Sequence, residues 1–90
     1  MTEALKISIE PVNMEIVCEP YAHMTYRGYA LVTDVKVNEQ FFMIYLSAKS
    51  FSIALEPFVV RNDNKFTGVK IKVSKETRDK MAPYLVSEAD

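Results

Sequence analysis

The sequence predicts a β-rich α+β fold, built either as a small curved antiparallel sheet or as a small barrel, with one or two short helices. Apolar residues alternate with polar ones over several short runs, which is the period of a half-buried strand. The runs RGYALVTDVKV and QFFMIYL are separated by only Asn38 and Glu39, as in a hairpin. The strand-helix-strand alternation that builds a parallel sheet is missing.

Length and composition predict one folded domain over residues 1–90. A chain of 90 residues buries only about 60 to 65 per cent of its unfolded surface, too little for two independent cores. Hydrophobic residues make up 49% of the chain and charged residues 26%, which is typical of a compact domain. A single cysteine and a single histidine offer neither a disulfide nor enough ligands for structural zinc, so no metal or cofactor is expected.

The first residues, MTEALK, lack the apolar segment of a secretion signal. No run approaches the roughly 18 apolar residues of a membrane-spanning helix. We therefore expect a protein of the cytoplasm, in its own cell or in a host cell, with no membrane partner.

Two short strands are predicted near the N-terminus. Apolar and polar residues alternate over 5–10 and again over 14–19, with Pro11 and Asn13 between the runs. These are two strands, or one strand broken by a bend. The following residues 21–26, YAHMTY, have no clean period and are predicted as a loop.

A tight turn at Asn38 and Glu39 would fix the register of the long hairpin. One face would then carry the core pairs Val37 with Gln40, Val35 with Phe42, Thr33 with Ile44 and Leu31 with Leu46. The opposite face would pair Lys36 with Phe41, Asp34 with Met43 and Val32 with Tyr45. Glu39 would have to adopt a positive φ at some cost, so a longer turn with a shifted register stays open.

The segment SAKSFSIALEPFVVRNDN fits two interpretations. As a helix capped by Ser47 it places apolar residues on one face, with Pro57 removing a backbone bond late in it: Ala48, Phe51, Leu55 and Phe58. As a strand, residues 51–55 alternate up to Pro57. The helix is favoured, followed by a turn at 61–64.

Residues 66–73 are predicted as a strand with two different faces. One face is apolar, with Val69, Ile71 and Val73, and the other carries Phe66, Gly68, Lys70 and Lys72. The run over 75–86 is predicted either as a helix capped by Ser74 or as a charged loop before a last strand at 83–86.

Charge is unevenly distributed along the chain. Residues 48–80 carry eight lysines and arginines against four acidic residues, whereas residues 1–47 carry three against six. A local basic surface is therefore expected although the net charge is only -1.

The order of these elements resembles that of small OB-fold proteins that bind single-stranded nucleic acid. The resemblance covers residues 27–87: a long strand, the hairpin TDVKVNEQFFMIYL, the connector SAKSFSIALEP, the strand FTGVKIKV and a final PYLV. The resemblance rests on the order of the elements and not on a diagnostic motif. OB-fold proteins of this kind are often more basic than this chain. The resemblance implies binding across the middle strands, onto Lys36, Phe41, Tyr45, Phe66, Lys70 and Lys72.

The same residues supply what binding of single-stranded DNA or RNA requires, namely cations for phosphates and flat rings for bases. Tyr26 and Arg27 would extend the site. The structural alternative is that Phe41, Met43 and Tyr45 form a second core layer while the lysines are merely solvated. No phosphate loop, metal pair or nucleophile motif is present, so an enzyme is not expected.

The second hypothesis is that the chain is a protein-interaction module, such as a small viral or mobile-element factor, or that it forms a homodimer. In that case the face with Phe41, Met43 and Tyr45, or an unpaired strand edge, would be buried against the partner.

Overall fold

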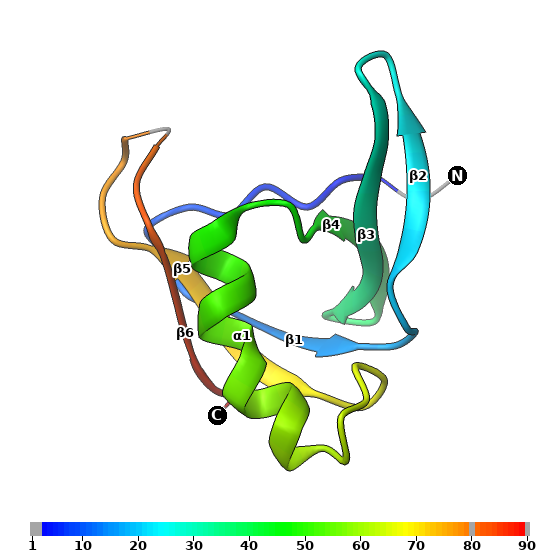
Figure 1. Cartoon of the computed structure of the whole chain (residues 1–90). Coiled ribbons are helices and arrows are strands. Elements are labelled where there is room, and N and C mark those ends of the chain that lie inside the picture. The colour runs from blue at the N-terminus through cyan, green and yellow to red at the C-terminus, as the bar shows by residue number, and fades with distance from the viewer. Residues whose placement is uncertain (1–2, 80, 90) are drawn as a thin grey trace.

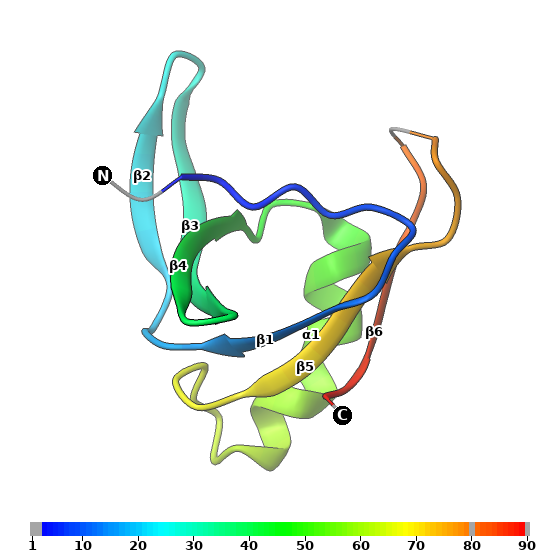
Figure 2. The ribbon, with the colours of Figure 1, turned by 180° about the vertical axis from the view of Figure 1, so that it is seen from behind.

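The computed structural model describes residues 3–79 and 81–89, which form a β-rich α+β fold (Figures 1 and 2). A curved six-stranded sheet packs its concave side against one helix (Figure 1). The elements in chain order are β1 (Val12–Ile16), β2 (Tyr21–Thr25), β3 (Gly28–Val37), β4 (Gln40–Tyr45), α1 (Lys49–Arg61), β5 (Lys70–Lys75) and β6 (Tyr84–Glu88). The predicted fold class, with a small curved antiparallel sheet, is confirmed.

The sheet is organised around β3. Along one edge of β3, its N-terminal half pairs with β2 and its C-terminal residues pair with β1; along the other edge it pairs with β4. β1 pairs with β5, and β5 with β6. Among the described residues β4 and β6 do not pair, so the sheet stays open.

The hydrophobic core lies between the concave side of the sheet and α1 (Figure 1). Its most deeply buried side chains, none more than 3% exposed, include Met14, Ile16, Val35, Phe51, Leu55, Ile71 and Val73. Ala48 and Phe58 pack against this cluster, which confirms the predicted apolar face of the helix.

The hairpin of β3 and β4 has the predicted register on both faces. Asn38 and Glu39 form its turn with φ values of 49° and 67°. Both residues adopt the left-handed backbone conformation that a two-residue hairpin turn requires. The turn therefore forms although Glu39, unlike glycine, has a side chain that disfavours a positive φ.

The helix begins later than predicted and continues past its proline. Ala48 is the N-cap residue, not Ser47, and no side chain caps the helix. The Ala48 carbonyl accepts the first helical bond, from the Ser52 N–H at 3.0 Å, which places the start one residue further on. Pro57 lies inside α1, which ends at Arg61.

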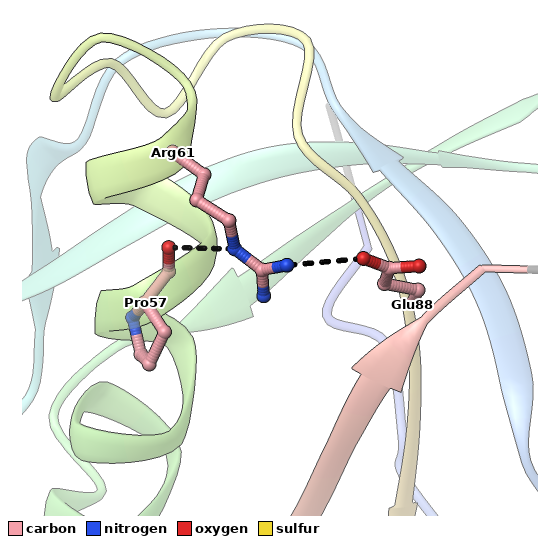
Figure 3. Close-up of polar contacts among 3 residues, drawn as sticks. All are labelled: Pro57, Arg61 and Glu88. Atoms are coloured by element: carbon pink, nitrogen blue, oxygen red, sulfur yellow. Dashed lines mark hydrogen bonds and ion pairs between the residues drawn. The ribbon is translucent and has the colours of Figure 1, made fainter.

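α1 is attached to β6 at both ends. The Arg61 guanidinium donates to the Pro57 carbonyl at 3.3 Å and to the Glu88 carboxylate at 3.1 Å (Figure 3). Near the other end of α1, Ser50 Oγ accepts a hydrogen bond from the Tyr84 N–H at 3.4 Å. These contacts hold the helix beside the last strand.

Residues 21–26, predicted as a loop, instead form β2 and the start of a turn. The Thr25 hydroxyl donates to the Gly28 carbonyl at 2.7 Å and closes this turn. Gly28 has a φ of 112°, a value that side chains disfavour. The prediction failed because aromatic or apolar residues occupy both faces of β2, which hides its period of two.

Residues 5–10, predicted as a strand, contain no regular strand. They cross from β4 to the end of β5, as Figure 2 shows. The Leu5 N–H donates to the Met43 carbonyl, and the Lys75 N–H donates to the Ser8 carbonyl, both at 2.8 Å. A bend at Ile9 and Glu10 then redirects the chain into β1.

The strand predicted over 66–73 begins only at Lys70. Its apolar face is as predicted, since Val69, Ile71 and Val73 are buried. Phe66 and Gly68 lie in the preceding turn and are not on the outward face of β5. The Glu19 carboxylate accepts hydrogen bonds from the backbone N–H groups of Phe66 and Thr67, and the Asn62 amide donates to the Thr67 carbonyl. These backbone groups are therefore engaged in the turn and not in strand pairing.

The C-terminal helix that was one alternative for 75–86 does not form in the described residues. Ser74 belongs to β5, and residues 76–79 form bends. The last strand, which was the other alternative, is β6.

Candidate functional site

The side of β2, β3 and β4 that faces away from α1, here called the outer face, carries the clearest cluster of aromatic side chains. Register places Tyr21 opposite Val32, and Val32 opposite Tyr45. His23 lies edge-on to Tyr45, with ring centroids 6.5 Å apart. Phe41 follows on the same face of β4. Tyr45 is 40% exposed and Phe41 57%, so both rings are available to a ligand.

Lysines lie beside this cluster on the same curved surface. Phe41 is opposite Lys36, Lys36 is opposite Glu15 on β1, and Glu15 is opposite Lys70 on β5. Lys36 and Lys70 are therefore two strands apart, about 10 Å along the sheet. Lys72 lies in the next row, opposite Asn13. The structure thus brings together Lys36, Phe41 and Tyr45, with the lysines of β5 beyond β1.

Other predicted site residues lie elsewhere. Phe66 packs against the core on the helix side of the sheet, so it does not join the rings of the outer face. Tyr26 and Arg27 are at the tip of the β2–β3 hairpin, where the guanidinium lies 5.4 Å from the centroid of the Tyr26 ring.

Acidic side chains offset much of the positive charge. The Lys36 ammonium lies 3.5 Å from the Glu39 carboxylate, and Glu15 separates Lys36 from Lys70. The outer face is therefore aromatic and nearly neutral, and it is less basic than the lysines of β5 suggested.

A hydrogen bond fixes one of the rings. The Tyr21 hydroxyl donates to the Asp34 carboxylate at 2.7 Å. This bond, with smaller contributions from burial and from the Asp34 charge, raises the pKa of Tyr21 to about 12. The Tyr21 hydroxyl is therefore already occupied by Asp34, and Tyr21 lies opposite Val32 in the sheet. Sequence reasoning considered Tyr21 and His23 as a possible extension of the aromatic platform but left them out of the site, because it placed them in a loop. The alternation of Tyr21, His23 and Thr25 with Ala22 and Met24 was the available signal.

The proposed apolar patch of Phe41, Met43 and Tyr45 is interrupted. Met43 is only 5% exposed, and its backbone N–H and carbonyl bond to Glu3 and Leu5. The two rings are therefore separate contact points.

A second surface lies on the opposite, inner side of the sheet. A groove with a volume of about 330 Å³ separates β3 from α1; its apolar lining is Leu31, Leu46, Leu55, Val59, Val60 and Phe66. The inner face of the β2–β3 hairpin continues this surface. There Met24 and Tyr29 are directly opposite each other and are 62% and 72% exposed.

No group of three or more His, Cys, Asp or Glu side chains within 3–79 and 81–89 is arranged to hold a metal ion. In that part of the chain no helix has the length and apolar character needed to cross a membrane.

The chain was compared with protein-family models, with curated proteins and with solved structures, and none of the three comparisons finds a match.

Proposed function

We propose that the protein binds single-stranded nucleic acid on its outer face, without strong base specificity. The observation that carries this proposal is the gathering of Tyr21, Tyr45 and Phe41 on one face, with Lys36 beside them and Lys70 on the neighbouring strands. Rings stack on bases whatever their sequence, and ammonium groups contact phosphates.

The proposal also draws on the resemblance to OB-fold proteins. If β1 and β2 count as one bent strand, the chain has five strands with a helix between the third and fourth. An OB-fold is a partly open barrel that binds oligonucleotides on the face of its second and third strands and on the loop before them. Those elements correspond to β3, β4 and the tip with Tyr26 and Arg27.

Stacking is expected to contribute more than charge. Phe41 and Tyr45 are four residues apart on β4, about 14 Å, which leaves room for an unstacked nucleotide between two stacked ones. Each stacked base contributes about 1 to 3 kcal/mol. Since Lys36 is paired and Glu15 separates the lysines, only about two phosphates would be neutralised, and log K should fall with log salt with a slope of about -1.4.

The test is fluorescence anisotropy with a labelled oligothymidine at several salt concentrations. Tyr45→Ala should weaken binding about 5- to 150-fold without changing the salt slope. Lys36→Ala with Lys70→Ala should flatten the slope. Ile53→Ala, at an exposed position on α1, is the control and should bind like the parent chain. Equal affinity of Tyr45→Ala and Ile53→Ala would contradict the proposal.

A second candidate function is protein interaction, through the β2–β3 hairpin and not through the interrupted face at Met43. The exposed Met24 and Tyr29 favour it, because contiguous exposed apolar surface usually marks an interface. Both candidates fit the expectation of a small cytoplasmic protein, including a viral or mobile-element factor.

A further inference from the structure

The three sheet edges differ in how the described chain covers them. At β4, the middle of the edge is bonded to Glu3 and Leu5. At β6, Ser50 and Arg61 attach the strand to α1. Within residues 3–79 and 81–89, β2 pairs only with β3 and ends the sheet. No backbone bond from the described residues reaches its outer edge, which is a template for another strand.

β2 also lacks the features that normally protect an edge strand. Such edges carry lysine, proline, a bulge or inward-pointing charges. Residues 20–33 contain one charged residue, Arg27, in a chain that is 26% charged, and Pro20 precedes the strand without entering it. Nothing in the composition of β2 opposes pairing with a further strand.

The hairpin that carries this edge extends beyond the rest of the sheet (Figures 1 and 2). β4 pairs with β3 only from Val32 onward, so the hairpin near its tip is a two-stranded ribbon with Met24 and Tyr29 exposed. An isolated two-stranded ribbon is only marginally stable in water, whereas a third strand stabilises it. The ribbon would therefore gain both hydrogen bonds and apolar burial from a partner.

We infer that β2 pairs antiparallel with β2 of a second copy of this chain, about a two-fold axis at His23. The inference specifies the partner for the second candidate function and does not depend on nucleic-acid binding. With the axis at His23, all five residues of β2 are paired. An axis at Ala22 or Met24 would pair only residues 21–23 or 23–25.

The register at His23 also makes the side chains complementary. Each Met24 lies opposite the small Ala22 of the second copy, on the inner face. Since Ala22 is opposite Leu31 and Met24 is opposite Tyr29 within one chain, the two copies form continuous apolar rows across four strands. No two like charges face each other, because β2 carries no Asp, Glu, Lys or Arg. A second copy therefore fits this edge better than a charged strand.

Cysteine cross-linking tests the register. Residues directly opposite in an antiparallel pair have Cα atoms about 4.5 or 5.5 Å apart, within the range that a disulfide spans. His23→Cys should form a disulfide-linked dimer under mild oxidation with glutathione. Ala22→Cys and Ile53→Cys should not, and the parent chain, with Cys18 alone, shows the background.

A charge variant tests the same contact without oxidation. His23→Lys places two ammonium groups opposite each other at the axis and should weaken the dimer by up to about fivefold. Tyr26→Lys adds the same charge at the hairpin tip, outside β2, and should leave the dimer unchanged. Sedimentation velocity over a hundredfold range of protein concentration measures both dissociation constants.

Two results would overturn the inference. One is a parent chain that stays monomeric over the whole concentration range. The other is a dimer in which His23→Cys cross-links no better than Ile53→Cys, since that dimer uses another surface. Neither result bears on the anisotropy experiment, so failure of self-pairing is distinguishable from failure of nucleic-acid binding.

Discussion

Glu19 joins the bend after β1 to the turn before β5. Its carboxylate accepts hydrogen bonds from the Thr67 hydroxyl at 2.7 Å, from the Thr67 N–H at 2.8 Å and from the Phe66 N–H at 3.1 Å. These bonds, the Thr67 hydroxyl first, hold the pKa of Glu19 below its usual value of 4.5. This side chain thus helps to hold the turn that precedes β5.

Glu19 makes the stability of the protein depend on pH in the acid range. Because its folded pKa is lowered, its stabilising contribution is present above pH 4.5 and is lost as the pH falls through the folded pKa. Glu19→Gln should therefore be less stable than the parent at neutral pH, with a difference that shrinks on acidification. Urea unfolding at neutral and acid pH measures this, with Glu56→Gln as control. A difference that stays constant with pH would contradict the assignment.

The Tyr21 hydroxyl should lose its proton at a higher pH than a tyrosine hydroxyl in water. Its hydrogen bond to Asp34 raises its pKa to about 12. The stability that this bond contributes is present below pH about 10, the unfolded value, and is lost as the pH rises towards the folded pKa. Ultraviolet titration of tyrosinate should show one late transition that Tyr21→Phe removes. If the late transition persists in Tyr21→Phe, another tyrosine is responsible.

At the scale of elements, the β3–β4 turn forms in spite of Glu39. The left-handed backbone conformation costs a residue other than glycine about 1 to 2 kcal/mol, and Glu39 adopts it with a φ of 67°. Glu39→Gly relieves this cost but also removes the exposed ion pair with Lys36. The net effect should be a rise in the free energy of unfolding of about 0.5 to 1 kcal/mol. Glu39→Ala removes the pair but keeps the strained conformation, so it should give no gain in urea unfolding. Equal stability of the two variants would show that the turn is not strained.

The same turn affects the proposed ligand. The Glu39 carboxylate is 3.5 Å from the Lys36 ammonium, so Glu39→Ala leaves Lys36 available to a phosphate. We expect tighter oligothymidine binding with a steeper salt dependence. An unchanged slope in anisotropy would place Lys36 outside the interface.

The hairpin of β3 and β4 was predictable because its turn and its alternation are local in sequence. β2 was not predictable from the sequence, since both faces of the ribbon carry aromatic or apolar residues. The start of β5 was not predictable either, because the hydrogen-bond partner of the Phe66 N–H is Glu19, 47 residues earlier. Residues 5–10 alternate like a strand but find only scattered backbone partners, one of them at Met43.

At the scale of the whole molecule, β5 lies at the centre of the core. Ile71 is fully buried and belongs to the cluster that joins β1, β3 and α1. Ile71→Ala should lower the free energy of unfolding by about 2 to 5 kcal/mol. Ile53→Ala, an exposed control on α1, should change it by no more than about 0.5 kcal/mol. Chemical denaturation measures both; similar losses would mean that the core lies elsewhere.

The candidate site was predictable only where its residues are placed by local sequence, as in the hairpin of β3 and β4. Lys36, Phe41 and Tyr45 share a face because one turn fixes their register. Lys70 joins them through the pairing of β1 with both β3 and β5, which no local pattern contains. The neutralising position of Glu15 follows from that same long-range pairing.

β3 belongs to two environments along its length. From Val32 onward it is part of the interior, whereas from Gly28 to Leu31 it is half of a projecting ribbon. Substitutions in the ribbon therefore need not repack any interior side chain. Substitutions at this end of the protein can therefore change its surface chemistry while the folded body stays as it is.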